Sequence, residues 1–433
     1  MYPLRTSTTH SGNAANGATW LAIILPGILV AATGVGAGDL LTASIAGSRV
    51  GLSVLWAAAF GALLKWVLNE GIARWQMATG TTLLEGWATR LGAWTHWVFL
   101  LYFVIWSFMV GGALINACGV AGAALVPLGD ANQSKIIWGI VHSLVGLAMV
   151  WLGGFKFFEK VMAACIAFMF VGVLVTAALL APDWAALAHG TLVPSVQRDG
   201  LPWILGVLGG VGGTVTLLSY GYWIRETGRT GREGVRICRI DLAVAYALSA
   251  LFGMGMILIG SRIVVQGQGT QLAAQLGEQL GLVLGPAGKW MFLLGFWGAV
   301  FSSLLGVWQS APYLFADFLR LRARGGNSAG RAARDTPLHE TAAYRTWLVA
   351  IAIVPLVTLW VSVQRIQLGY AIMGACFMPL LALTLLILNN HPRWLAREFR
   401  TGMALNALLA IIVLLFAWMG YLQVTGRMPS TGA

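Results

Sequence analysis

Long apolar runs alternate along the chain with short segments that hold most of its charged residues. A run of about 18 or more apolar residues is long enough to cross a bilayer as a helix. The pattern therefore predicts about 11 transmembrane helices. They cover roughly residues 20 to 47, 52 to 73, 94 to 125, 135 to 152, 158 to 180, 202 to 224, 240 to 260, 288 to 316, 344 to 363, 368 to 389 and 402 to 422.

Two of these spans are interrupted by glycines. In the first, Gly34, Gly36 and Gly38 stand at alternate positions and are followed directly by Asp39. In the sixth, between Trp203 and Trp223, glycines cluster in the first half. Glycine is a weak helix former, and a carboxylate in hydrocarbon costs about 2.5 to 3.5 kcal/mol. Such a stretch is tolerated where it is buried in protein or lines a cavity, so we predict a broken helix in each span.

The two interrupted spans lie five positions apart in the series. If spans 1 to 5 and 6 to 10 are copies of one unit, the odd number of crossings forces opposite orientations and places both breaks at corresponding positions. Glycine also serves close helix packing, which is the alternative for any single position. We predict an all-α polytopic membrane protein with a 5+5 inverted repeat and broken helices 1 and 6. Its parts are a tail at 1–19, a core at 20–390 with repeats at about 20–180 and 202–390, and an eleventh helix and tail at 391–433.

Composition supports the membrane assignment. The chain is 58% hydrophobic and 10% charged, whereas soluble domains have about 25% charged residues. The net charge of +12 resides in the segments between spans, which argues against nucleic acid as a partner.

With the N-terminus inside, the cytoplasmic segments hold 19 Lys and Arg and the external segments hold 7. This asymmetry predicts a multi-pass cell-membrane protein with a cytoplasmic N-terminus and an external C-terminus. The four cysteines have no paired spacing and are expected to be free thiols.

Several segments of the chain form a recognisable combination: PGILVAATGVGAGDLLTASIAG, LLKWVLNEGIARWQMATGTTLLE, FKFFEK, GTLVPS, the pair Thr214 and Val215, and GFWGAVFSSLLGVWQ. Together they resemble the NRAMP family of divalent-metal transporters. That family has P-G near the start of its first helix, D-P-G-N at the break, and a Q-E-x-x-A-R-like end of its second helix before T-G. The resemblance implies the leucine-transporter fold and alternating access.

The chain departs from the family at its metal-binding motifs. On D-P-G-N it reads Gly36, Ala37, Gly38 and Asp39, so glycine replaces the metal-binding aspartate and Asp39 replaces the asparagine. Where the sixth helix of the family has A-T-V-M-P-H, this chain has Thr216 in place of the metal-binding methionine. In the third helix, the family's acidic residues linked to proton movement fall near Trp106, Ala113 and Asn116. The resemblance therefore predicts the scaffold but not an unchanged metal site.

The two breaks offer hard oxygen ligands. A transition-metal site favours a carboxylate with sulfur or imidazole, and neither Met nor His stands at the matching places. Asp39, hydroxyl groups and freed carbonyls suit a small hard cation or the polar end of an organic solute. Asp39 is our candidate metal ligand, and it is also placed to cap the half-helix beginning at Leu40. The candidate substrate-binding residues are Thr33, Gly36, Asp39, Thr42, Gly213, Thr214, Thr216 and Ser219.

Four polar residues of the second and third spans are candidates for coupling or gating: Lys65, Glu70, Arg74 and Asn116. Glu70 and Arg74 stand four residues apart, which suits an intrahelical ion pair as well as a gate. Lys65 lies near mid-span. It has three alternatives: to extend toward the interface, to pair with a buried carboxylate, or to stand in for a bound cation.

Pattern and resemblance together predict a secondary-active transporter whose midplane site lies at the breaks of helices 1 and 6. The resemblance implies a metal ion as substrate. A hard cation or small organic solute on the same scaffold, and a non-transporting membrane sensor, are the alternatives. No predicted span contains H-E-x-x-H or G-x-S-x-G, so we expect no enzyme, and we expect no cofactor. The expected partners are the substrate and the lipid bilayer, and the oligomeric state is not predicted.

Overall fold

The computed structural model describes residues 36, 38–152, 156–180, 183–196, 200–221, 224, 229, 231–264, 269–324 and 338–425. All regular secondary structure in these residues is helical. The elements are η1 (Gly38–Thr42), α2 (Ala43–Val50), η2 (Gly51–Val54), α3 (Leu55–Thr79), α4 (Leu83–Gly86), η3 (Trp87–Leu91), α5 (Ala93–Leu125), α6 (Ala131–Leu152), α7 (Lys156–Leu179), α8 (Trp184–Leu192), α9 (Leu201–Gly210), η4 (Val215–Leu218), α11 (Gly231–Gly260), α12 (Leu272–Arg324), η7 (Leu338–Glu340), α13 (Ala342–Ile353), η8 (Val354–Trp360), α14 (Val363–Leu388), η9 (Arg397–Phe399) and α15 (Met403–Thr425).

Most predicted spans have a helical counterpart. Within the described residues, 9 helices are long and apolar enough to cross a membrane, or up to 10 if α7 and α8, which are bent by 118°, form one span. This is fewer than the eleven expected. Residues 20–35 of the first span lie outside the described part, and 38–79 counts as one stretch although it contains η1, α2 and α3.

Two helices differ from the sequence prediction. α11 begins at Gly231, not near 240, because Gly234, Val235, Cys238 and Leu242 are buried at helical spacing while the arginines between them face outward. The expected loop up to residue 239 is therefore helical in its second half. α12 starts at Leu272 and contains a break at Gly285, whose φ of 71° lies in the left-handed region, directly before Pro286.

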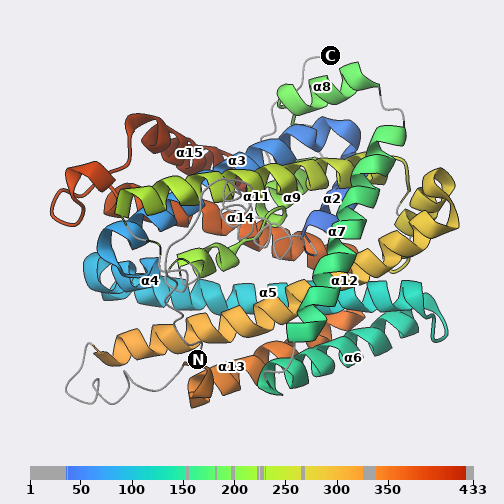
Figure 1. The fold of residues 1–433 in the computed structure, drawn as a ribbon, viewed down its shortest axis with the longest axis horizontal. Helices are drawn as coiled ribbons and strands as arrows, with labels where there is room; N and C mark the ends of the chain where they lie inside the picture. Colours follow the sequence, from blue (N-terminus) through green and yellow to red (C-terminus); the bar gives the residue numbers. More distant parts are fainter. Residues whose placement is uncertain are drawn as a thin grey trace, which may run out of the picture.

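The helices form two groups, which are connected by α7 and α14. α5 packs against α6, α12 and α14, and α13 packs against α12 and α6. On the other side, α11 lies along α3 and α2, and α15 lies against α14 (Figure 1). α9 packs on α14, α3 and η1, so the second glycine-rich segment lies in the centre of the bundle.

Glycines permit close backbone contact between α2 and α11. A Cβ atom added at Gly47 would lie 2.1 Å from the Ile257 carbonyl oxygen, and one at Gly260 would lie 2.3 Å from the Ser44 carbonyl oxygen. Small residues at such crossings let helices approach in a membrane. This contact holds α2, the half-helix that follows the first break, against α11 of the same group.

Candidate functional site

The first break leads into a π-helical turn, η1, that carries Asp39. The side chain of Asp39 is buried, with 1% of its surface exposed. Its Oδ2 accepts a hydrogen bond from the Gly36 amide at 3.2 Å, and its Oδ1 accepts one from the Gly212 amide at 3.1 Å. The expected cap on the half-helix beginning at Leu40 is not the arrangement observed. Asp39 instead bridges the two breaks, because Gly212 belongs to the second one.

The second break follows α9. Gly212 and Gly213 have φ values of 77° and 87°, which L-residues with a side chain rarely adopt. Thr214 follows with φ −135° and ψ −111°, and the 3-10 turn η4 begins at Val215. The helix therefore stops at Gly210 and resumes as a tighter turn, as the glycine cluster predicts.

The two breaks touch backbone to backbone. A Cβ atom at Gly38 would lie 2.1 Å from the Gly210 carbonyl oxygen, so only glycine fits there. Thr42 lies against the same helix: its Cγ2 would be 3.3 Å from a Cβ at Gly206. The Thr42 hydroxyl is buried and has no hydrogen-bond partner among the described residues. A buried hydroxyl of this kind is available to a ligand.

Lys65 extends from α3 to the end of α9. The residue is completely buried, and its Nζ donates to the Gly209 carbonyl oxygen at 2.9 Å and to the Val211 carbonyl oxygen. Its stem lies beside Gly212, whose amide donates to Asp39. Of the three alternatives for Lys65, extension to the interface is wrong, because the ammonium points into the protein. The other two are both compatible with the structure.

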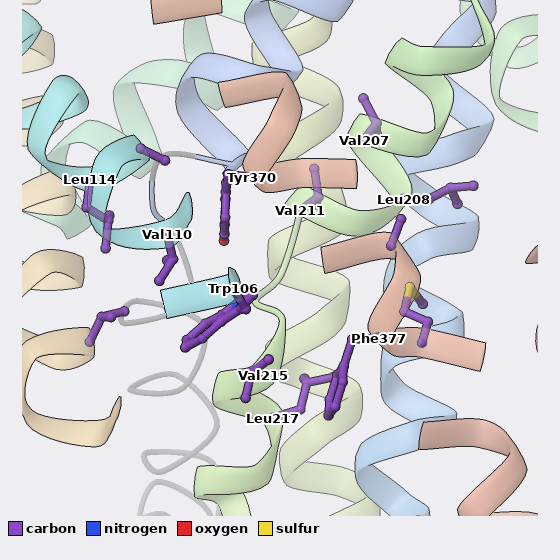
Figure 2. Packing of buried hydrophobic residues seen from close by; sticks show 14 of the residues in the cluster. Trp106, Val110, Leu114, Val207, Leu208, Val211, Val215, Leu217, Tyr370 and Phe377 are labelled. Atoms are coloured by element: carbon purple, nitrogen blue, oxygen red, sulfur yellow. The ribbon is translucent and has the colours of Figure 1, made fainter. Parts of the chain in front are cut away.

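Thr214 connects the second break to α5 and α14. Its Oγ1 accepts a hydrogen bond of 2.8 Å from the Trp106 indole nitrogen, and the Tyr370 hydroxyl also bonds to it. Figure 2 shows the irregular chain from Val211 to Val215 beside Trp106, with the hydroxyl end of Tyr370 pointing toward the indole. Trp106 is thus a hydrogen-bond donor held against the second break.

The remaining candidates are Thr216 and Ser219 at the second break and Thr33 at the first. Thr216 is half-buried, and its Oγ1 would lie 3.1 Å from a Cβ at Gly213. Ser219 is buried at 6% exposure, in the turn after η4. Thr33 lies outside the described residues.

Glu70 and Arg74 form the intrahelical ion pair, and the pair belongs to a larger network. Glu70 Oε1 also accepts from Arg239 Nε of α11 at 2.8 Å. Arg74 donates to the carbonyl oxygens of Phe399 and Arg400 at 3.2 and 3.3 Å. The network joins α3, α11 and the segment before α15.

Asn116 lies away from the breaks. Its Nδ2 donates to the Gly112 carbonyl oxygen at 2.9 Å and to Thr358 Oγ1 at 3.1 Å, which ties α5 to η8. Gln367 on α14 donates to the Ala113 carbonyl oxygen at 2.8 Å in the same region. A role for Asn116 in coupling stays a prediction, separate from the substrate site.

Sequence reasoning missed Tyr370 and Gln367 of α14, and Tyr246 of α11, whose hydroxyl accepts from Asn69 at 2.6 Å. A signal for the α14 pair was present, because Gln367 and Tyr370 stand three residues apart in an apolar span and share a face. The contact between Asn69 and Tyr246 joins residues 177 positions apart, so no local pattern predicts it.

The polar groups at the two breaks are carboxylate, hydroxyl and carbonyl oxygens, which can bind a cation, and the ammonium of Lys65. The described residues contain no group of three or more His, Cys, Asp or Glu that could hold a metal ion. Hard cations prefer oxygen ligands. The arrangement therefore suits a hard cation, or a solute whose polar groups match the pair of Asp39 and Lys65.

Sequence comparisons place the chain beside metal transporters. The family model described as natural resistance-associated macrophage protein-like matches residues 27–425. The divalent metal cation transporter MntH of Deinococcus radiodurans is 26% identical over 298 residues, which cover 64% of this chain and 65% of that protein. MntH of Aeromonas hydrophila is 22% identical over 311 residues, covering 69% and 74%. The chain thus matches just under two thirds of the length of the Deinococcus protein.

Solved structures match over nearly the whole chain. The manganese transporter of Eremococcus coleocola, in complex with an aromatic bis-isothiourea substituted compound, gives a TM-score of 0.67 at 16% identity and covers 98% of this chain and 91% of that one. MhsT in complex with L-phenylalanine gives 0.58 at 12% identity and covers 93% and 98%. The leucine-transporter-type fold that the family resemblance implies is confirmed.

Proposed function

Since this chain belongs to the Nramp family, we propose that it is a secondary-active transporter that moves a metal cation across a membrane by alternating access. The substrate site lies where the two helix breaks meet. One observation carries the proposal: Asp39, in the first break, accepts a hydrogen bond from Gly212, in the second, 173 residues later.

The burial of the site supports alternating access. Asp39, Thr42 and Thr214 are at most 2% exposed, so a solute reaches them only after helices move. The glycine contact between Gly38 and Gly210 gives the two breaks a shared surface that can move as one unit. Rocking of one helix bundle against another around such a site is how transporters of this architecture work.

The ligand atoms favour a hard cation. Carboxylate, carbonyl and hydroxyl oxygens suit Mg²⁺ and Mn²⁺ better than softer metals. Asp39 supplies the negative charge, and the unpaired Thr42 hydroxyl supplies a neutral oxygen nearby. Thr216 and Ser219 line the turn on the other side and complete the proposed substrate-binding set.

A second candidate substrate follows from Lys65. Its ammonium lies at the same break as the Asp39 carboxylate, and two opposite charges there leave no net negative charge to attract a divalent ion. A zwitterionic or neutral organic solute fits a balanced pair better. The indole of Trp106 and the ring of Tyr370 beside Thr214 would contact its apolar part.

Topology and repeats complete the proposal. The excess of Lys and Arg in one set of loops supports a cytoplasmic N-terminus and an external C-terminus in the cell membrane. We place the inverted repeats at about 20–180 and 202–390, with the eleventh helix outside them.

Uptake into proteoliposomes tests the function. Mn²⁺ and Mg²⁺ are offered separately, and a mixture of labelled amino acids and small amines is offered in parallel. We expect saturable metal uptake by the wild type and at least a tenfold lower rate for Asp39→Asn. Glu278→Gln, which changes a carboxylate 63% exposed on α12, is the matched control and should leave the rate unchanged.

Two results would redirect the assignment. Saturable uptake of an organic solute without metal uptake would establish the second candidate on the same scaffold. A folded protein that moves none of these compounds would leave the non-transporting sensor as the remaining alternative.

A further inference from the structure

We propose that Lys65 is a tethered cation: its ammonium fills a monovalent-cation position at the end of α9, so the protein needs no alkali ion there. The inference concerns the residue next to the substrate site and rests on the proposed function only for its transport measurement. The binding measurement stands without it.

The broken helix creates the cation position. The last carbonyl groups of a helix have no partner within the helix and must be satisfied by side chains, water or ligands. Here the Gly209 and Val211 carbonyl oxygens both accept from Lys65 Nζ. The ammonium therefore occupies the place where freed carbonyls of a discontinuous helix coordinate a cation.

A carboxylate completes the arrangement. The Gly212 amide donates to Asp39 at 3.1 Å, while a Cβ at Gly212 would lie 3.6 Å from Lys65 Cδ. The lysine stem and the Asp39 carboxylate thus both lie beside Gly212. Two carbonyl oxygens with a nearby carboxylate are ligands that a hard monovalent cation accepts.

A second buried lysine provides the contrast. Lys135 of α6 is also fully buried, and its Nζ donates to the Val361 carbonyl oxygen at 3.4 Å, at the end of η8. Among the described residues, neither lysine forms an ion pair with an acidic side chain. Burial and a helix end are shared by both lysines, whereas two carbonyl acceptors, and a carboxylate bonded to the adjacent Gly212, are found only at Lys65.

Shortening Lys65 should open this position to a free ion. Lys65→Ala removes the ammonium and its stem but leaves the Gly209 and Val211 carbonyls and Asp39 in place. Sodium or potassium should then bind the vacated space. Lys65→Met fills most of the same space without a charge, so it should gain no ion dependence.

Thermal unfolding of the purified protein measures the binding. The wild type, Lys65→Ala, Lys65→Met and Lys135→Ala are compared in NaCl, KCl and choline chloride at equal ionic strength. Only Lys65→Ala should be stabilised by the alkali ion, saturably. An ion at ten times its dissociation constant shifts the folding equilibrium about elevenfold. Equal unfolding of Lys65→Ala in all three salts, or the same alkali dependence in the wild type, would overturn the proposal.

Two further measurements keep the test decisive. If Lys65→Ala does not fold, Lys65→Ser leaves similar space and is read in the same way. In proteoliposomes, the wild-type uptake rate should stay within twofold when choline replaces sodium and potassium, and a tenfold drop would contradict the tethered cation. If no substrate is transported at all, the proposed function fails while the unfolding experiment still decides the role of Lys65.

Discussion

At the scale of single residues, glycine defines the site as much as Asp39 does. Gly38 and Gly210 bring the two breaks into contact, and Gly212 and Gly213 adopt left-handed backbone conformations. Asp39 can accept from the Gly212 amide only because that turn exposes it. The polar chemistry therefore depends on positions that carry no side chain.

Gly38→Ala tests the backbone contact. The new Cβ would lie 2.1 Å from the Gly210 carbonyl oxygen, so the helices must separate, and overpacking of this kind costs about 1 to 3 kcal/mol. We expect a lower unfolding temperature and loss of uptake. Gly306→Ala is the control, because a Cβ there meets nothing within 4 Å, and it should be neutral or slightly stabilising. Equal behaviour of the two variants would show that the breaks do not need this contact.

The sequence predicts which residues lie at the breaks, but it does not predict their hydrogen-bond partners. Glycine spacing and a carboxylate in a membrane-length run identify Asp39 from local sequence alone. Its acceptor role toward Gly212 and the position of Lys65 depend on α3 and α9 packing together, which only the tertiary structure supplies. The cap at the half-helix beginning at Leu40 is not observed, because the two Asp39 oxygens accept from the Gly36 and Gly212 amides instead.

At the scale of elements, α3 holds the site at one end and an ionic network at the other. Lys65 reaches the break, and Glu70, just over one turn later, pairs with Arg74 and with Arg239 of α11. Arg74 also bonds the carbonyls of Phe399 and Arg400 before α15. A movement of α3 that opens the site must therefore strain or break this network, which supports the predicted gating role of Glu70 and Arg74.

Glu70→Gln tests the network. The substitution leaves Arg74, which is 5% exposed, without its charged partner, and breaking a buried pair costs about 3 to 5 kcal/mol. We expect a clear fall in unfolding temperature and a changed uptake rate. Glu278→Gln breaks a pair whose acidic side chain is 63% exposed and should cost less than about 1 kcal/mol. A loss no larger than that of the control would argue against the network.

Helix existence was predictable, and helix ends were not. Apolar runs predict α5, α6, α14 and α15 well, because each run is about as long as its helix. Hydropathy predicts a loop at the charged start of α11, because it does not detect that Gly234, Val235 and Cys238 form one buried face. α8 also escaped prediction, because a short apolar helix of 9 residues falls below the length of a span.

At the scale of the molecule, the fold is shared with the relatives, whereas the substrate does not follow from the fold. The family match and the solved relatives agree on the architecture. At the positions where the resemblance implies metal ligands, this chain has Gly36 and Thr216, and Lys65 places an ammonium at the end of α9. The scaffold is thus shared with these relatives, and the substrate has to be argued from this chain's own residues.

Cysteine labelling tests the orientation of the whole chain. Leu128→Cys and Arg393→Cys place thiols at exposed positions in the loops between α5 and α6 and between α14 and α15, on predicted opposite faces. Both are made in a chain whose native cysteines are replaced, since Cys376 is exposed. An impermeant maleimide added to intact cells should label Leu128→Cys and not Arg393→Cys, because the loops that hold the excess of Lys and Arg face the cytoplasm. The reverse pattern would invert the topology.

Access to Thr216 from both faces tests the central claim, which is that the breaks form an alternating-access site. Thr216 is half-buried at the second break, so Thr216→Cys in the same cysteine-free chain reports solvent entry. In oriented vesicles we predict that an impermeant thiol reagent modifies this cysteine from either face, applied separately, and that the transported substrate slows both reactions. Modification from one face only, unaffected by any substrate, would contradict alternating access through this site.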